Sequence, residues 1–320
     1  MTSVTAVRVV SLLPSTTEIL FAIGAGDAVV GVTVDCDFPP EARGRRIVSS
    51  SALPAGLTPG EIDRAVRARI AAGDDVYRLD EGALRDLDPD LVITQDLCAV
   101  CAVDLSTIEA ATDYLGCDSE VLTIDPSTLD EVIASISTIG AAVGRRREAD
   151  RLTAGLRARL DRIAAAVVDL PGPRVAVLEW TDPPFSAGHW LPDMVAAAGG
   201  VPVLGEAGQR SRRVGWPEVT ATDADLIVVA PCGFHLADAH RLADDLVAGG
   251  RLPPGVPVWA VDADAAFVRP GPRLVDGVET LAAICHPGRA ASGALAAYVG
   301  TTSATPNPPR STTSPTTSGG

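Results

Sequence analysis

The stretch from Pro126 to Leu170 limits most strongly what this chain can fold into. Apolar residues recur along it at steps of three and four, after a Pro-Ser-Thr composition that is typical of a helix start. Gly140 and Gly144 weaken the pattern, but it resumes and continues until Pro171 stops it. About 40 helical residues would run roughly 60 Å, which is longer than one small domain is wide. The sequence therefore predicts one long, rigid helix that joins two lobes.

Strands and helices alternate on both sides of this helix. Near the N-terminus an apolar run leads through Pro14 into a helix, with Ser15 or Thr16 as its N-cap and Glu18 placed to support the cap. Beyond Pro173 the order repeats. Residues 174–178 resemble 8–12, residues 223–229 resemble 88–94, and residues 256–261 resemble 121–124. This internal duplication predicts an α/β fold of two Rossmann-like lobes with mostly parallel sheets and a ligand cleft between them.

The expected organisation has four parts. These are an N-terminal α/β lobe (residues 1–125), the bridging helix (126–170), a C-terminal α/β lobe (171–300) and a disordered tail (301–320). The tail is assigned to disorder because it consists mainly of Thr, Ser, Pro and Gly without an apolar period.

The composition restricts the class of partner. The net charge is -15, the pI is near 4.6 and there is no lysine, so a nucleic-acid surface or a patch for anionic membranes is not expected. No segment has the roughly 20 apolar residues that are needed to span a bilayer. The N-terminus lacks the features of a signal peptide, which predicts a cytoplasmic protein unless the true start lies upstream. We expect a monomer that binds a small molecule.

Aromatic residues suggest where that molecule binds. They make up only 4% of the chain, yet Trp180, Phe185 and Trp190 fall within one turn between a strand and a helix. Each aromatic alone is more often a core residue, but together with Trp216 and Phe234 they favour a ligand wall. The other candidates are His189 in the same turn, as a ligand contact or a helix N-terminal hydrogen bond, Pro14 and Ser15 in the corresponding turn of the first lobe, and Gln95 beyond a buried strand.

Four cysteines follow predicted strands and could meet at the cleft. Cys98 and Cys101 form a C-x-x-C pair, which can hold half of a tetrahedral zinc site or form a redox disulfide. The further ligands would have to come from Cys36, Cys232 or His235. The alternative is that these are small buried cysteines without chemistry.

Arg269 is held by prolines in the sequence Arg-Pro-Gly-Pro-Arg before a predicted helix. A fixed arginine at a cleft edge suits a ligand that carries amides or carboxylates. A salt bridge to one of the many acidic residues is the equally weighted alternative.

Hydrolytic chemistry finds little support, because the chain has no Gly-x-Ser-x-Gly, no His-Glu-x-x-His and no phosphate-binding loop with a lysine.

Several short motifs resemble one known family. They are Arg8-Val9-Val10-Ser11-Leu12-Leu13-Pro14-Ser15-Thr16-Thr17-Glu18, Asp37-Phe38-Pro39-Pro40, Pro89-Asp90-Leu91-Val92-Ile93, Pro183-Pro184-Phe185, Trp216-Pro217-Glu218-Val219 and Arg269 with Pro272-Arg273. Together they resemble the vitamin B12-binding members of the Fe/B12 periplasmic-binding superfamily, the substrate-binding proteins of corrinoid and siderophore importers. The match runs from Arg8 to about Cys285.

The resemblance implies two Rossmann-like lobes bridged by a rigid helix. It also implies that Phe38, Phe185, Trp216 and Arg269 occupy positions of corrinoid-contacting residues. The chain departs from the family in three respects: it shows no export signal, Ser51 replaces an aromatic residue on the rim of the first lobe, and the permease-docking glutamate is replaced near Thr222.

The first hypothesis is therefore non-enzymatic binding of a corrinoid, such as cobalamin, or of a related metal chelate. Trp180, Phe185, Trp190 and Trp216 would hold the ligand, Arg269 would contact its peripheral amides, and His189 or a cleft cysteine could reach its metal. An ABC permease or a corrinoid-handling protein would be the partner. The alternative is an enzyme or metal chaperone with zinc or iron on Cys36, Cys98, Cys101 and Cys232. A third possibility is an ordinary lipoprotein subunit of an importer whose start is misplaced.

Overall fold

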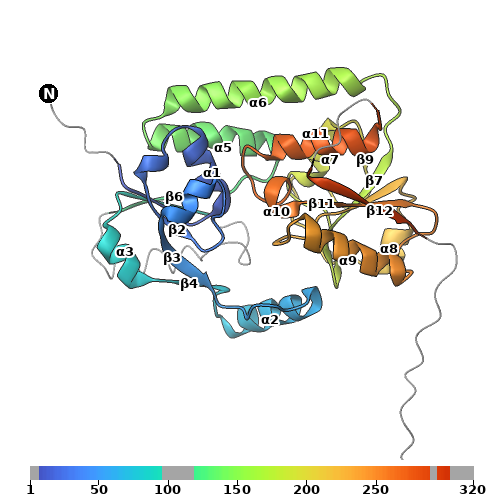
Figure 1. Cartoon of the computed structure of the whole chain (residues 1–320), viewed down its shortest axis with the longest axis horizontal. Coiled ribbons are helices and arrows are strands. Elements are labelled where there is room, and N and C mark those ends of the chain that lie inside the picture. The colour runs from blue at the N-terminus through green and yellow to red at the C-terminus, as the bar shows by residue number, and fades with distance from the viewer. Residues whose placement is uncertain (1–6, 96–118, 289–293, 303–320) are drawn as a thin grey trace, which may run out of the picture.

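A computed structural model describes residues 7–95, 119–288 and 294–302 of the chain. Two sheets lie side by side along the longest axis of the molecule, each with its own helices (Figure 1). Most strand pairs within them are parallel, so the expected α/β fold of two mostly parallel sheets is confirmed.

The first lobe is built around a six-stranded sheet in the order β4-β3-β2-β1-β5-β6, in which only the β3–β4 pair is antiparallel. Its strands are β1 (Val9–Ser11), β2 (Val29–Thr33), β3 (Arg46–Ser51), β4 (Tyr77–Leu79), β5 (Leu91–Thr94) and β6 (Glu120–Thr123), and its helices are α1 (Pro14–Ala22), α2 (Pro59–Ala72), α3 (Glu81–Leu87) and the short 3-10 helices η1 (Gly26–Ala28) and η2 (Pro40–Gly44).

The second lobe has the strand order β12-β11-β10-β7-β8, with β9 also paired to β7. The β11–β12 and β7–β8 pairs are antiparallel. Its strands are β7 (Arg174–Thr181), β8 (Pro184–Ser186), β9 (Val201–Pro202), β10 (Leu226–Val229), β11 (Pro257–Val261) and β12 (Ala296–Thr301), and its helices are α7 (Leu191–Ala197), α8 (Trp216–Thr220), α9 (Leu236–Ala248), α10 (Ala263–Ala266) and α11 (Leu274–Cys285).

The internal duplication extends to individual hydrogen bonds. In the first lobe the backbone N–H of Arg8 donates to the carboxylate of Asp90 at 2.7 Å, which ties β1 to the start of β5. In the second lobe the N–H of Arg174 donates to Asp225 at the same distance, which ties β7 to the start of β10. Both arginine side chains also bond to the carbonyl groups just before these strands. The two lobes therefore repeat one supersecondary unit, as the sequence predicts.

The expected single helix over residues 126–170 is wrong, because the structure has two helices there. They are α5 (Leu129–Ala142) and α6 (Arg146–Val167), which pack against each other as a hairpin. Gly144 adopts a left-handed conformation with φ +69°, which favours glycine and ends the first helix. The N–H groups of Gly144 and Arg145 donate to the carbonyls of Ala141 and Gly140, so a Schellman motif reverses the chain. At about 1.5 Å per residue α6 is roughly 33 Å long.

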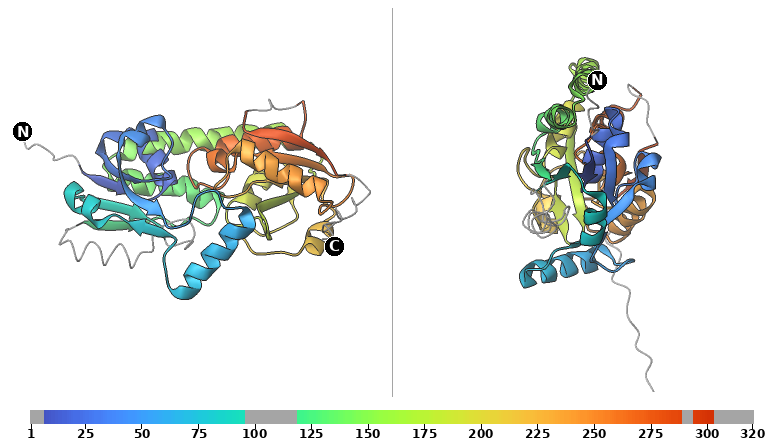
Figure 2. Two further views of the ribbon diagram at one scale, coloured as in Figure 1. Left: turned by 60° about the horizontal axis from the view of Figure 1, so that its bottom comes forward. Right: turned by 90° about the vertical axis from the view of Figure 1, so that its left-hand side faces the viewer.

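Each helix of the hairpin packs into both lobes. Leu129 of α5 belongs to the apolar core of the second lobe, whereas Ile139 at the other end of α5 belongs to the core of the first. Helix α6 runs back in the opposite direction. Its Leu156 packs in the core of the first lobe, and its Ile163 packs against the core of the second lobe. The right-hand view of Figure 2 shows both helices together along one side of the molecule. The bridge is thus a helix pair that is anchored in two cores.

The two helices approach closely at one point. A Cβ atom on Gly140 would lie 2.4 Å from the Cβ of Ala149, so only glycine fits there. The glycine that weakens the helical pattern in the sequence is therefore a packing requirement of the hairpin.

None of the described helices is both long and apolar enough to cross a membrane.

Candidate functional site

The two lobes meet through residues that follow the carboxyl ends of their strands. In α/β sheets this is the edge at which ligands bind. From the first lobe come the start of α1 and the loop after β2, and from the second come the loops after β7, β10 and β11. Helix α2 also reaches from the first lobe towards the second (Figure 2). We call this set of contacts the inter-lobe site.

Arg269 lies at the centre of the inter-lobe site and joins both lobes. Its guanidinium donates to Asp37 of the first lobe at 2.5 Å and to Asp264 of the second at 3.1 Å. Its side chain is only 12% exposed. Of the two roles that the sequence left open for Arg269, the structure shows the salt bridge. A ligand would have to compete with Asp37 for this group.

His235 links the same carboxylate to a third loop. Its Nδ1 lies 2.9 Å from Asp262, and its Nε2 lies 3.4 Å from Asp37. Burial alone would lower the pKa of His235, but Asp262, Asp264 and Asp37 together raise it. These carboxylates stabilise the protonated imidazole, in which both nitrogens carry a proton.

Glu18 is the most buried charge of the site, with a side chain only 3% exposed. It accepts two hydrogen bonds from Arg273 of the second lobe, at 2.9 Å from Nε and 2.6 Å from Nη2. Burial raises the pKa of Glu18, although the bond to Arg273 opposes this. The expected capping role is wrong: no side chain caps α1, its N-cap is Leu13, and Glu18 points to the other lobe.

Aromatic side chains flank the polar groups on the second lobe. Trp180 pairs with Phe185 across β7 and β8, and its ring centroid lies 5.7 Å from that of Phe234. The indole N–H reaches the first lobe, where it donates to the carbonyl of Pro59 at 3.3 Å. Trp180 and Phe234 of the sequence-predicted ligand wall are therefore in contact at the inter-lobe site, and Phe185 lies opposite Trp180 on the neighbouring strand.

Phe38 contributes an aromatic ring from the first lobe. The guanidinium of Arg273 lies over this ring, 4.0 Å from its centroid. The residue nevertheless keeps 41% of its surface exposed. Phe38 is thus a partly exposed aromatic ring at the boundary between the lobes.

Two tryptophans of the predicted wall lie elsewhere. Trp190 is 6% exposed and belongs to the core of the second lobe, where its indole N–H donates to the carbonyl of Phe267 at 2.7 Å. Trp216 packs at the edge of the second lobe, and Arg251 lies 5.9 Å from its ring. No contact in the described part of the chain joins either residue to Trp180, so a ligand role for them stays a prediction.

The remaining candidates lie near the site but are mostly covered. Ser15 is buried beneath Gly271, and Gln95 is 6% exposed at the end of β5. His189 precedes α7; burial and the charge of Arg210 lower its pKa, and its Nε2 is buried without a hydrogen-bond partner among the described groups. Pro14 begins α1 beside Ser15.

The cysteines give no support to a metal site. Cys36 is buried between Thr17 and Thr33, which lie 3.1 and 3.2 Å from its sulfur, and burial raises its pKa. Cys232 is exposed. Cys98 and Cys101 lie outside the described residues. Within the described ranges no cluster of His, Cys, Asp and Glu is arranged to hold a metal ion.

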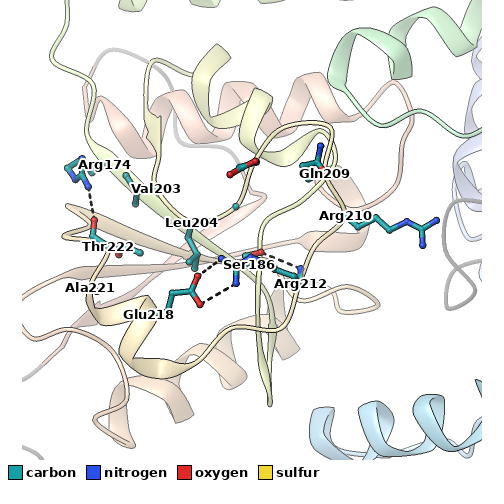
Figure 3. Close-up of a pocket in the computed structure, with 12 residues that line it drawn as sticks. Arg174, Ser186, Val203, Leu204, Gln209, Arg210, Arg212, Glu218, Ala221 and Thr222 are labelled. Carbon is teal, nitrogen blue, oxygen red and sulfur yellow. Dashed lines mark hydrogen bonds and ion pairs between the residues drawn. The ribbon is translucent and has the colours of Figure 1, made fainter. Parts of the chain in front are cut away.

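A separate cavity of about 640 Å³ lies within the second lobe (Figure 3). Three of its charged groups already have partners, because Arg212 pairs with Glu218 and Arg174 donates to the carbonyl of Thr222. Thr222, which occupies the region of the permease-docking glutamate in the resemblance, is 8% exposed. Figure 3 shows Arg210 pointing out of this cavity towards the first lobe. All residues that line the cavity belong to the second lobe, so it is separate from the inter-lobe site.

Sequence reasoning missed most of the polar part of the inter-lobe site. Glu18 was assigned to a cap, and Arg273, Asp262 and Asp264 were not singled out as site residues. The one available signal was the Arg-Pro-Gly-Pro-Arg motif, in which Gly271 lies against Ser15 and Glu18.

Comparisons with known proteins agree with this fold. The chain is 27% identical over 291 residues to the uncharacterized ABC transporter substrate-binding lipoprotein YvrC of Bacillus subtilis, covering 88% of this chain and 80% of that protein. It is 26% identical over 289 residues to a cobalamin-binding protein of Halobacterium salinarum, covering 87% and 69% of the two chains. A periplasmic heme-binding protein of Pseudomonas aeruginosa has a similar structure, with a TM-score of 0.68, 20% identity, and coverage of 92% and 98%.

These relatives contradict the cytoplasmic location that was expected from the N-terminus, because one is a lipoprotein and another is periplasmic. A family profile described as periplasmic binding protein matches residues 9–249. Proteins of this kind bind solutes and are not enzymes, which confirms the expectation of a non-enzymatic binding role at that level. The matched residues run from β1 to the end of α9, which includes the first lobe, the hairpin and much of the second lobe, and the chain belongs to the periplasmic binding protein family.

Proposed function

We propose that this protein binds a corrinoid, or a closely related metal chelate, at the inter-lobe site and serves an ABC importer outside the cytoplasm. The observation that carries the proposal is the aromatic surface at the boundary of the lobes. Trp180, Phe185 and Phe234 lie on the second lobe, and Phe38 lies on the first. A flat ligand of low polarity on its faces gains most from such paired aromatic walls.

The charges at the site favour an amide-bearing ligand. The four carboxylates of Glu18, Asp37, Asp262 and Asp264 face three basic groups, Arg269, Arg273 and His235, and all three are already paired with them. A haem carries two carboxylates, which would have to compete with these carboxylates for the three basic groups. The peripheral amides of a corrinoid can instead donate hydrogen bonds to these oxygens. We therefore favour a corrinoid over haem, although the chain resembles proteins named for either ligand.

A parallel titration of three chelates tests this choice. Purified protein is titrated with hydroxocobalamin, haemin and a ferric siderophore, and binding is followed by visible absorbance and calorimetry. We expect saturable binding of hydroxocobalamin with one ligand per chain and weaker binding of the other two. Tighter binding of haemin would contradict the charge argument, and the absence of binding by all three would overturn the proposed function.

The importer part of the proposal is supported by the Bacillus subtilis lipoprotein, which is named as an ABC transporter substrate-binding protein. Deleting the gene should slow the uptake of labelled cobalamin by cells that depend on an external supply. Unchanged uptake would argue against a transport role while leaving ligand binding untouched.

A further inference from the structure

The aromatic ring of Phe38 is partly exposed and is also contacted by a cation. One guanidinium lies over it, and that guanidinium belongs to Arg273 at the start of α11 in the other lobe. A cation 4.0 Å from a ring centroid is well within the range in which cation–π attraction acts. The ring is thus in contact with the opposite lobe through Arg273, although it keeps 41% of its surface exposed.

Arg273 is itself fixed. Its Nε and Nη2 donate to the two oxygens of Glu18, which is a fork-to-fork geometry that sets the plane of the guanidinium. Glu18 lies on α1 and is only 3% exposed, so its carboxylate has little freedom to move. A lysine could keep the charge but could not present a flat group to the ring while bonding to both oxygens.

We propose that Arg273 is a positioning residue that holds the Phe38 ring as the first-lobe platform for the ligand, with Glu18 as the anchor of Arg273. The inference rests on the proposed function for the identity of the ligand. The arrangement makes the platform depend on the second lobe, because Arg273 reaches the ring only when α11 lies against α1. Because the charges of Arg273 and Glu18 balance each other, the pair orders the ring without favouring an anionic ligand.

The position of the ring can be tested without any ligand. The chain contains five phenylalanines, so labelling with 4-fluorophenylalanine gives a simple ¹⁹F NMR spectrum, and Phe38→Leu identifies one signal. We expect this signal to shift in Arg273→Lys and in Glu18→Gln. The matched control is Arg159→Lys, because Arg159 also makes paired contacts with carboxylates, Asp276 and Glu279 of α11, away from Phe38. An unchanged Phe38 signal in Arg273→Lys would overturn the proposal.

A double-mutant cycle connects the ring to binding. Arg273→Lys should weaken the binding of hydroxocobalamin by about two- to fivefold, which is the size of one cation–π contact. In the Phe38→Leu background the same change should have no further effect, because Arg273 acts through the ring. Additive losses would overturn the proposal and indicate that Arg273 supports binding independently of Phe38. If the wild-type protein binds none of the chelates, the proposed function fails, whereas the NMR comparison still decides whether Arg273 positions Phe38.

Discussion

At the scale of single residues, the inter-lobe site is dominated by side chains that serve both lobes. His235 is the clearest case, because Asp262 of its own lobe and Asp37 of the other lobe approach its two nitrogens. Neither carboxylate is near His235 in the sequence. An imidazole that faces a carboxylate at each nitrogen gains from protonation, so part of the contact between the lobes should depend on pH.

The sign of this dependence follows from the pKa shift. The pKa of His235 is raised above 6.5 in the folded protein, so the native state binds the proton more tightly than the unfolded chain does. The contribution of His235 to stability is therefore complete below pH 6.5, the unfolded pKa. It is lost as the pH rises through the pKa of the folded state. Melting temperatures measured between about pH 6 and 8 should fall more steeply for the wild type than for His235→Gln. The contribution of His235 to the free energy of unfolding should stay below about 1 kcal/mol, because the imidazole is more than half exposed.

Asp262→Asn provides the matched variant for this measurement. Asp262 caps α10, because its side-chain oxygen accepts a hydrogen bond from the N–H of Ala265. The side-chain oxygen of an asparagine can accept the same bond. The variant should nevertheless flatten the pH dependence as His235→Gln does. Equal slopes for the wild type and both variants would show that His235 does not carry a raised pKa.

At the scale of elements, the helix hairpin determines how the lobes are connected. Two helices that each enter both apolar cores resist bending better than one helix, because any hinge motion must disturb packing in both cores. The hairpin depends on the close approach of α5 and α6 at Gly140. We therefore expect the two lobes to move little relative to each other on the side of the hairpin.

A matched pair of glycine substitutions tests the hairpin. Gly140→Ala should destabilise the protein by about 1–3 kcal/mol, because the new Cβ would meet Ala149 at 2.4 Å and force the helices apart. Gly155→Ala in α6 should instead stabilise it by about 0.5–1 kcal/mol, because nothing lies within 4 Å of that position and alanine favours a helix. Urea denaturation measures both effects. A neutral or stabilising Gly140→Ala would contradict the observed packing.

At the scale of the whole molecule, the sequence predicts what depends on local pattern. The apolar runs around Val9 and Val175, and the helices that follow them, appear as expected, because burial on both faces of a parallel strand leaves a continuous apolar segment. The hairpin was not foreseen. Gly140 and Gly144 indicate weak points of a helix in the sequence. A reversal of the chain also requires that α6 packs against α5, and this packing is a property of the folded chain.

The candidate site was predicted only in part, for a related reason. Trp180, Phe185 and Phe234 were found because rare aromatics cluster near strand ends. The ion pairs were missed because they join residues far apart in the sequence: Arg273 and Glu18 are 255 positions apart, and Arg269 and Asp37 are 232 apart. No short-range pattern marks such pairs.

The central claim is that the ligand binds between the aromatic groups of the two lobes. Calorimetric titration of Trp180→Ala with hydroxocobalamin, beside the wild type, tests it most directly. Trp259→Ala is the control, because Trp259 packs against Tyr298 in the sheet of the second lobe. We predict that Trp180→Ala binds the ligand about tenfold more weakly or worse, while Trp259→Ala retains wild-type affinity. Equal affinity of Trp180→Ala and the wild type would place the ligand elsewhere and contradict the account.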